Sequence, residues 1–419
     1  MAGPITTTQK RTLLAASLGW MLDSMDMMLY SMALVAIQRE MGISASTSGL
    51  LISLTLVSSA AGGVLFGLLA DRFGRARALI GSILVYSVFT AACGFAQNIV
   101  QLAVFRVLLG LGVGGEWATG AALVSETWPA EHRAKALGLM QSSWAVGYAL
   151  AALVTAAVMP RFGWRAVFFV GVLPALVTVW IRRKVPEPEI WKKSKVQGPR
   201  SKVAGSPSTL DLGLGTLDSF RSLFAPQLRR RTIVLTAMNA ASMFGWWGLF
   251  TWIPGYLALP VSEGGRGLSI LRTSQWILLM QAGMWLGYVM YGVLADALGR
   301  KRTYIGYLLI AAALVPFYSL ARSPEAVMLL GPFVAFFGTG YFSGFGAISS
   351  ESFPTTVRGT AMGFAYNFGR GLSAMAPYTI GRLSESYGLG ASFLITSAAF
   401  LAAALIALGI EETRGKRLE

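Results

Sequence analysis

The sequence predicts an all-α polytopic membrane protein, with twelve transmembrane helices in two pseudo-symmetric six-helix halves. The first observation is composition: of 419 residues, 54% are hydrophobic and 13% are charged, which is too apolar for a soluble domain. The second is a series of apolar runs of about the 20 residues that a membrane-spanning helix needs. The third is an internal duplication, which relates the runs of the first half to those of the second.

Twelve apolar runs follow one another along the chain, six before and six after a polar centre. Glycine and proline inside these runs do not end them, because neighbouring helices in a bilayer satisfy the backbone groups that they free. The expected helices lie near 13–37, 49–70, 78–97, 101–125, 136–158, 165–183, 232–258, 273–297, 303–321, 325–350, 359–383 and 387–410.

Two motifs recur at one spacing and define the duplication. GLLADRFGR at 67–75 returns as GVLADALGR at 292–300, an offset of 225 residues (292 − 67), and a Glu-Pro-Arg-Gly pattern at 126–138 returns at 351–363. The segment between the halves is polar, basic and rich in Gly, Ser and Pro, as flexible linkers are. We therefore predict an N-terminal half over 1–183, a cytoplasmic linker over 184–230 and a C-terminal half over 231–419.

The distribution of basic residues predicts the topology. With the N-terminus in the cytoplasm, seven of the 35 Lys and Arg residues lie outside and two lie inside helices, which leaves 26 on the cytoplasmic side. This asymmetry fits the positive-inside rule, so the net charge of +16 requires no nucleic-acid partner. We expect a multi-pass protein of a bacterial-type inner membrane with both termini cytoplasmic, acting as a monomer.

The two loop motifs resemble those of the major facilitator superfamily. GLLADRFGRAR matches that superfamily's loop between helices two and three, and GVLADALGRKR matches its loop between helices eight and nine, with Ala297 where the first copy has Arg72. The superfamily consists of two six-helix halves with binding at their interface. Helix four, with FRVLLGLGVGGEWATGAALVSETWPAEHRAKALG, resembles the sialate and lactate proton symporters. The first helix, with GWMLDSMDMMLY, is similar to them and to aromatic-acid proton symporters.

Three acids fall well inside predicted helices: Asp23, Asp26 and Glu116. A charged carboxylate there costs at least about 2.5–3.5 kcal/mol unless it is paired or protonated. Asp23 and Asp26 share one helix face near the midplane, so both cannot ionise cheaply, and we expect them to exchange a proton. A helix cap or a permanent ion pair is the alternative. Positions 248 and 251, equivalent to the two aspartates, hold Gly and Thr, so one half alone carries these acids.

Two arginines also fall inside predicted helices. Arg106 matches, by resemblance, an Arg-x-x-x-Gly pattern associated with proton transfer, and its alternative is an outer-end arginine that extends to the headgroups. We expect Glu116, ten residues further on, not to pair with it. Arg370 lies near the midplane, where it either grips a substrate carboxylate with its planar fork or pairs with Asp23, Asp26 or Glu116. We assign proton coupling to Asp23, Asp26, Glu116 and Arg106.

Further residues are candidates for substrate contact and for a cytoplasmic gate. Polar and aromatic side chains within the spans could line the cavity beside Arg370, although packing is their alternative role: Tyr30, Gln141, Asn239, Trp246, Asn367 and Tyr341. Residues of alternating charge near the cytoplasmic ends of helices two, four, eight and ten suit weak ion pairs that break in each cycle: Asp71, Arg72, Arg75, Glu126, Arg133, Asp296, Arg300, Glu351 and Arg358.

These features predict a secondary transporter that moves a small organic anion together with protons by alternating access, with no enzymatic activity. A monocarboxylate such as lactate is the first expectation, and an aromatic acid or sialate is the alternative. A proton-coupled drug exporter is a second alternative, although helix five lacks the Gly-Pro-x-x-Gly-Gly pattern of antiporters. Fold alone would also allow a non-transporting sensor. With one cysteine, Cys93, and one histidine, His132, we expect no cofactor and no metal site.

Overall fold

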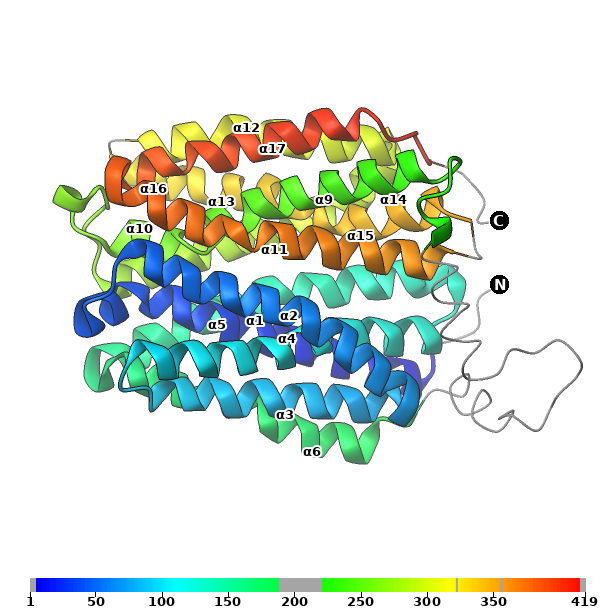
Figure 1. Ribbon diagram of the computed structural model, residues 1–419, viewed down its shortest axis with the longest axis horizontal. Helices are drawn as coiled ribbons and strands as arrows, with labels where there is room; N and C mark the ends of the chain where they lie inside the picture. The colour runs from blue at the N-terminus through cyan, green and yellow to red at the C-terminus, as the bar shows by residue number, and fades with distance from the viewer. Residues whose placement is uncertain (1–4, 188–220, 322, 355–356, 415–419) are drawn as a thin grey trace, which may run out of the picture.

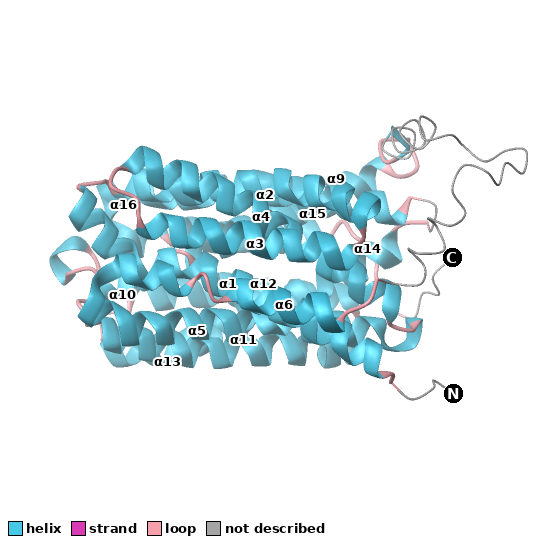
Figure 2. Ribbon diagram, turned by 90° about the horizontal axis from the view of Figure 1, so that it is seen from below, coloured by secondary structure: helices cyan, strands magenta, loops and turns pink. Residues whose placement is uncertain are grey.

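The structure is a computed structural model that describes residues 5–187, 221–321, 323–354 and 357–414. Every regular element in these ranges is a helix (Figure 2). The first six are α1 (Thr7–Met41), α2 (Ala45–Phe73), α3 (Arg75–Gly94), α4 (Ile99–Thr127), α5 (Ala130–Val170) and α6 (Pro174–Lys184). The later ones are α9 (Arg229–Phe250), α10 (Ile253–Ala258), η1 (Val261–Glu263), α11 (Ile270–Leu298), α12 (Arg300–Leu320), α13 (Pro324–Gly340), α14 (Phe342–Ser352), α15 (Arg358–Ser373), α16 (Met375–Ser392) and α17 (Leu394–Ala407).

The helices form one elongated bundle. Helices α1 to α6 occupy one side of it and α9 to α17 the other (Figure 1), and we call these the first and second halves. Helix α1 begins and α17 ends at the same end of the bundle, while α10 lies at the other (Figures 1 and 2). We call these the terminal end and the distal end.

Within the described ranges, nine helical segments are long and apolar enough to cross a membrane, or ten if one bent pair counts as a single span. This is fewer than the twelve predicted, because some stretches are continuous through a bend. One segment runs from Lys135 to Ile181, 47 residues, yet Gly163 inside it has φ 74°. The bent pair, 361–392 with 394–407, turns by 73°. Both stretches are longer than a bilayer core of about 30 Å requires at 1.5 Å per residue.

Polar side chains define where the helices begin. Ser44, Asn98, Ser269 and Ser323 precede α2, α4, α11 and α13, and each accepts a hydrogen bond from the backbone N–H three residues later. Such caps satisfy donors that the first turn of a helix leaves unpaired. The turns between helices are therefore encoded locally, while the apolar runs between the caps supply the packed surfaces.

The duplicated loop motif has one geometry in both halves. Gly74 and Gly299, 225 residues apart (299 − 74), have φ 117° and 106°, a region that side chains other than glycine rarely adopt. Behind each glycine a carboxylate accepts backbone N–H bonds at the start of the next helix: Glu187 from Ala76, and Glu412 from Arg300. These two acids are also 225 residues apart (412 − 187), so the repeat includes the ends of both halves.

The predicted linker is described only at its edges. Residues 188–220 lie outside the described part, and α6 ends at Lys184. Just before α9, the Leu223 side chain is buried and its carbonyl accepts a hydrogen bond from the Thr232 hydroxyl.

Candidate functional site

The three acids predicted inside the membrane are fully buried where α1 meets α3 and α4. Asp26 accepts a 2.9 Å hydrogen bond from the Thr90 hydroxyl of α3. Asp23 has no hydrogen-bond partner among the described residues, but it lies within electrostatic reach of Arg370, Asp26 and Glu116. The positive charge that acts on Asp23 thus comes from the other half of the bundle.

Glu116 enters the same region from α4 because α1 leaves room for it at Gly19. A Cβ added at Gly19 would lie 2.3 Å from Glu116 Oε1, so any larger residue would displace the carboxylate. Glu116 therefore faces α1. Neither carboxylate oxygen has a hydrogen-bond partner in the described part of the chain. An unpaired carboxylate in such a setting is favoured only when it carries a proton.

Arg106 is also fully buried, so it does not extend to lipid headgroups. Its Nε donates a 3.0 Å hydrogen bond to the Thr55 hydroxyl of α2, and its guanidinium carbon lies 4.1 Å from the centre of the Tyr30 ring. This cation–π contact partly offsets the missing counter-ion. Its Nη1 and Nη2 atoms have no hydrogen-bond partner among the residues described. No ion pair joins it to Glu116 in this part of the chain, in line with their ten-residue separation.

Arg370 occupies the last turn of α15, just before the chain bends into α16 at Ala374. Its side chain is 3% exposed, and within the described ranges its Nε and Nη2 atoms have no hydrogen-bond partner. Arg370 forms no ion pair of 4 Å or less with a described residue. The alternative of a fixed pair with Asp23, Asp26 or Glu116 is therefore not seen in this conformation. The planar guanidinium instead borders a central cavity.

This cavity, of about 30 Å³, lies between the two halves. Aromatic rings make up most of its wall, and Trp144 is their hub, with ring centroids 4.7 Å from Trp20, 5.8 Å from Trp246 and 6.2 Å from Trp247. The first half supplies Trp20, Gln141 and Trp144, and the second half supplies Met243, Trp246, Trp247, Tyr288, Phe342, Tyr366 and Arg370. Arg370 is the single charged residue of this lining.

The substrate-contact residues predicted from sequence divide into two groups. Gln141, Trp246 and Arg370 line the cavity. The other four are engaged elsewhere: Tyr30 lies beneath Arg106, Asn239 donates to the carbonyls of Ala365 and Tyr366, Tyr341 donates to the carbonyl of Ser242, and Asn367 donates to that of Gly363. In this conformation those four stabilise helix packing.

Sequence reasoning missed most of the aromatic wall. Trp20, Trp144 and Trp247 lie in apolar spans, where an aromatic residue is more often a packing or interfacial residue. Their common location depends on how α1, α5 and α9 pack together, which no single span reveals. The adjacent Trp246–Trp247 pair, with rings at 83° and centroids 4.7 Å apart, was the one local signal.

A closing cluster of four residues (Trp117, Gln141, Tyr288 and Tyr366) lies on the terminal side of the cavity. Trp117 of α4 and Tyr366 of α15 stack across the halves, with centroids 4.3 Å apart and planes at 8°. Trp117 Nε1 donates to Gln141 Oε1 at 3.4 Å, and the Gln141 side chain lies close to the Tyr288 hydroxyl of α11. Each half contributes two members, so the cluster joins the halves on this side of the cavity.

The distal end is closed by backbone packing between α2 and α16. A Cβ at Gly49 would lie 2.3 Å from the Pro377 carbonyl, and one at Gly381 would lie 2.4 Å from that of Ala45. The Glu385 carboxylate accepts a 2.9 Å hydrogen bond from the backbone N–H of Ser46, across the halves. The two halves are therefore in direct contact at the distal end.

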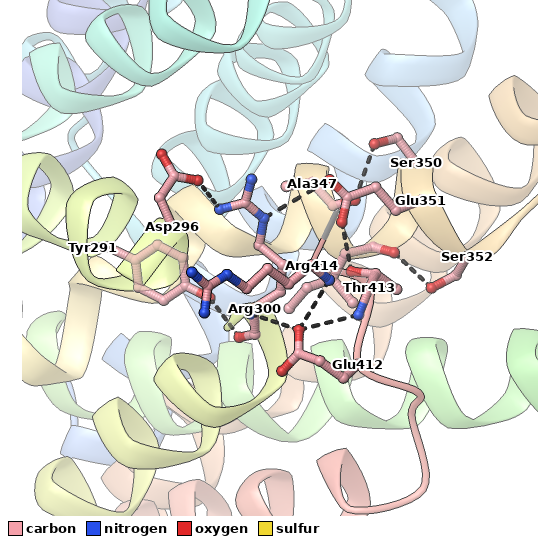
Figure 3. A network of polar contacts seen from close by, with 11 residues as sticks. Tyr291, Asp296, Arg300, Ala347, Ser350, Glu351, Ser352, Glu412, Thr413 and Arg414 are labelled. Carbon is pink, nitrogen blue, oxygen red and sulfur yellow. Dashed lines mark hydrogen bonds and ion pairs between the residues drawn. The ribbon is translucent and has the colours of Figure 1, made fainter. Parts of the chain in front are cut away.

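The predicted gate residues lie at the terminal end, and the ion pairs seen there join helices of the same half. Arg75 of α3 pairs with Glu126 of α4 at 2.9 Å. Arg300 of α12 pairs with Asp296 of α11, and its Nε lies 3.8 Å from Glu351 Oε1 of α14 (Figure 3). We expected such pairs to hold this end shut, but those described brace each half separately.

The remaining gate candidates are one exposed arginine and three residues whose side chains are not described. Arg72 is exposed, and its guanidinium lies 5.4 Å from the Phe73 ring. The side chains of Asp71, Arg133 and Arg358 lie outside the part that the structure describes. Around Glu351 the chain end contributes as well: the Thr413 hydroxyl donates to Glu351 at 2.5 Å, and Glu412 accepts from the backbone of Arg300 and Arg414 (Figure 3).

Comparison with known proteins extends this description. The family model of the Major Facilitator Superfamily matches residues 16–271 and 264–419. The chain is 34% identical to the cis,cis-muconate transport protein of Acinetobacter baylyi, covering 97% of this chain and 95% of the relative. It is 31% identical to the niacin transporter NiaP of the same organism, with 99% and 97% covered. It is 28% identical to the sialic acid transporter NanX of Escherichia coli, with 97% and 95% covered.

A solved structure described as a D-xylose-proton symporter has the same fold, with a TM-score of 0.77 at 19% identity, over 98% of this chain and all of that one. The helical bundle, the buried arginine at a central cavity and the family match agree with one another. This chain belongs to the major facilitator superfamily and is a multi-pass membrane transporter, not an enzyme.

Proposed function

We propose that this chain is a proton-coupled symporter that moves small organic acids across the inner membrane by alternating access. The observation that carries the proposal is Arg370, whose guanidinium borders an aromatic cavity with Nε and Nη2 lacking partners in the described part of the chain. A carboxylate is the group that a planar guanidinium binds best, through two parallel hydrogen bonds. Asp23, within electrostatic reach from the other half, supplies the proton-binding group.

The coupling follows from charge balance. Without substrate, Arg370 and an ionised Asp23 partly neutralise each other across the halves. When a substrate carboxylate occupies the guanidinium, Asp23 loses that compensation, and a buried carboxylate without a counter-charge is stable only with a proton. Binding of the anion therefore promotes binding of a proton at Asp23. Asp26 and Glu116, close by on α1 and α4, are the groups through which that proton reaches or leaves the site.

The aromatic wall favours a planar, unsaturated acid over a small saturated one. Four tryptophans, two tyrosines and a phenylalanine offer stacking faces. Two relatives are named for transport of muconate and of niacin. Muconate has a conjugated chain beside its carboxylates, and niacin has a pyridine ring beside its carboxylate. Lactate, the first expectation from sequence, has neither, and the named relatives give it no particular support. The aromatic-acid alternative is better supported, and sialate keeps support from the relative named for sialic acid.

We also propose twelve membrane crossings, with both termini in the cytoplasm and a monomer as the working unit. The break at Gly163 lets the Lys135–Ile181 segment cross twice, and the 73° bend beyond α16 does the same for the last two crossings. Residues 1–183 and 231–419 would then be the two six-helix halves joined by the linker 184–230. The excess of basic residues at the terminal end supports its cytoplasmic location.

Uptake into proteoliposomes tests the function. With an alkaline interior, labelled nicotinate or muconate should accumulate above equilibrium. An ionophore that collapses the pH gradient should abolish the accumulation, and excess lactate should compete poorly.

Arg370→Lys keeps the charge but loses the planar fork, so we expect binding of the acid to weaken at least tenfold. Arg272→Lys, an exposed position at the start of α11, is the matched control. Wild-type accumulation without a pH gradient would refute proton coupling, and unchanged affinity in Arg370→Lys would refute its role.

A further inference from the structure

The interface between α5 of the first half and α11 of the second carries a regular polar stripe. The two helices pack against each other across the halves and lie side by side in both views (Figures 1 and 2). Gln141, Tyr148 and Thr155 are spaced seven residues apart on α5, and Ser274, Gln281 and Tyr288 are spaced seven apart on α11. Residues at this spacing share one face of a helix.

The stripe begins at the central cavity and leads toward the distal end. Gln141 and Tyr288 line the cavity and lie close to each other. Ser274 lies 14 residues before Tyr288 (288 − 274), which is about 21 Å along α11 at 1.5 Å per residue, and only four residues after the start of that helix. The stripe therefore runs from the cavity to Ser274, near the distal end of α11.

Most of the stripe beyond the cavity is buried without polar partners. Gln281 is 3% exposed, Ser274 1% and Thr155 0%. The Gln281 amide oxygen and nitrogen, Ser274 Oγ and Thr155 Oγ1 have no hydrogen-bond partner among the residues that the structure describes. Buried polar groups are normally paired, since an unpaired one bears the full cost of its desolvation. Tyr148 is the exception, because its hydroxyl donates to the Phe250 carbonyl at 2.9 Å.

The other interface between the halves has the opposite character. Along α2 and α16, glycines bring backbones into contact, and the polar groups are paired: Ser53 Oγ accepts from the Tyr378 N–H at 3.3 Å, and Glu385 accepts from the Ser46 N–H. Separation of α2 from α16 breaks hydrogen bonds. Separation of α5 from α11 instead lets water reach groups that the closed interface leaves unsatisfied.

We propose that the α5–α11 interface is the route by which water and the organic acid enter the central cavity from the distal side. Gln281, midway along the stripe, is the polar contact for the substrate on this route, since its amide both donates and accepts hydrogen bonds. The identity of the substrate on this route rests on the proposed function. The entry of water along this route is inferred from the polar stripe alone.

Thiol labelling tests the route. In a Cys93→Ala background, which removes the only cysteine of the chain, Ser274→Cys and Thr155→Cys place a thiol on each side of the interface. Ser87→Cys is the matched control, because Ser87 is also buried with an unpartnered hydroxyl among the described residues, but lies on α3 inside the first half. Intact cells are treated with the membrane-impermeant reagent trimethylammonium-ethyl methanethiosulfonate, and labelling rates are compared.

We expect Ser274→Cys and Thr155→Cys to be labelled at least ten times faster than Ser87→Cys. The group added at either position should then block nicotinate uptake, whereas the same group on exposed Val261→Cys in η1 should not. Labelling of both interface thiols at the rate of Ser87→Cys, in protein that folds and reaches the membrane, overturns the proposal. Labelling without loss of uptake overturns the route for substrate. Absence of organic-acid uptake in the unlabelled parent counts against the proposed function and leaves the labelling result intact.

Discussion

Removal of the stacked pair in the closing cluster should open the cavity toward the terminal end. Trp117→Leu eliminates the stack with Tyr366 and the hydrogen bond to Gln141. An aromatic pair contributes about 0.5–1.5 kcal/mol beyond its buried area, which corresponds to a factor of about 2 to 13 in the ratio of open to closed states. The hydrogen bond adds at most about 1 kcal/mol at its 3.4 Å length. Trp117 does not line the cavity, so substrate contacts stay in place.

The assay is the distance between spin labels on Lys135→Cys at the start of α5 and Arg302→Cys on α12, both exposed and on opposite halves, in the Cys93→Ala background. The population with the longer distance should rise severalfold in Trp117→Leu. Trp117→Phe keeps a ring to stack but loses the N–H donor, so its shift should be smaller. An unchanged distance distribution in folded Trp117→Leu protein would show that the cluster does not control this end.

Three further predictions concern the acids. Asp23→Asn and Asp26→Asn should each abolish pH-driven accumulation yet allow substrate counterflow, because an amide cannot carry the coupled proton; concentrative uptake by both variants at wild-type level would contradict this. Gly19→Ala forces Glu116 to move and should destabilise the protein by about 1–3 kcal/mol, a penalty that thermal unfolding should find largely absent in a Glu116→Ala background. Partial burial acts to raise the pKa of Glu412, but backbone N–H donors hold it below its usual value. Its stabilisation is therefore present above the unfolded pKa and lost as pH falls, so the melting-temperature deficit of Glu412→Gln should shrink from pH 7 toward pH 3.

The parts of the fold that follow from local rules could be predicted from sequence. Apolar runs gave the positions of the helices, and the recurrence of Gly74 as Gly299 gave the internal symmetry. Asp23, Asp26 and Glu116 could be selected because a carboxylate within an apolar run has few reasons to be there other than function. Their burial follows from the same local context.

The parts of the structure that depend on contacts between distant helices could not be predicted from the sequence. Trp20, Trp144 and Trp247 meet at the cavity only because α1, α5 and α9 converge, and each alone is indistinguishable from a packing residue. Asn239 was expected at the cavity but ties α9 to α15 instead. The ion pairs of Arg75 and Arg300 were expected to close the terminal end. The alternation of charges in the sequence predicts that these residues form ion pairs. The placement of the helices decides whether a pair lies within one half or joins the two halves.

The two halves share a backbone arrangement but differ in the charged residues at equivalent positions. Packing around those positions accounts for part of this difference. The position equivalent to Asp23 is Gly248, where an added Cβ would lie 2.9 Å from Thr396 Cγ2 and 3.3 Å from Ile380 Cγ1, so the second half has no room for an acid there. The position equivalent to Arg370 is Ala145, which is a buried residue of the hydrophobic core. The acids to which we assign proton binding are thus confined to one half, and the guanidinium to which we assign anion binding lies in the other. In the proposed mechanism, rocking of the halves changes the distance between Asp23 and Arg370, and this change would link movement of the substrate to movement of the proton.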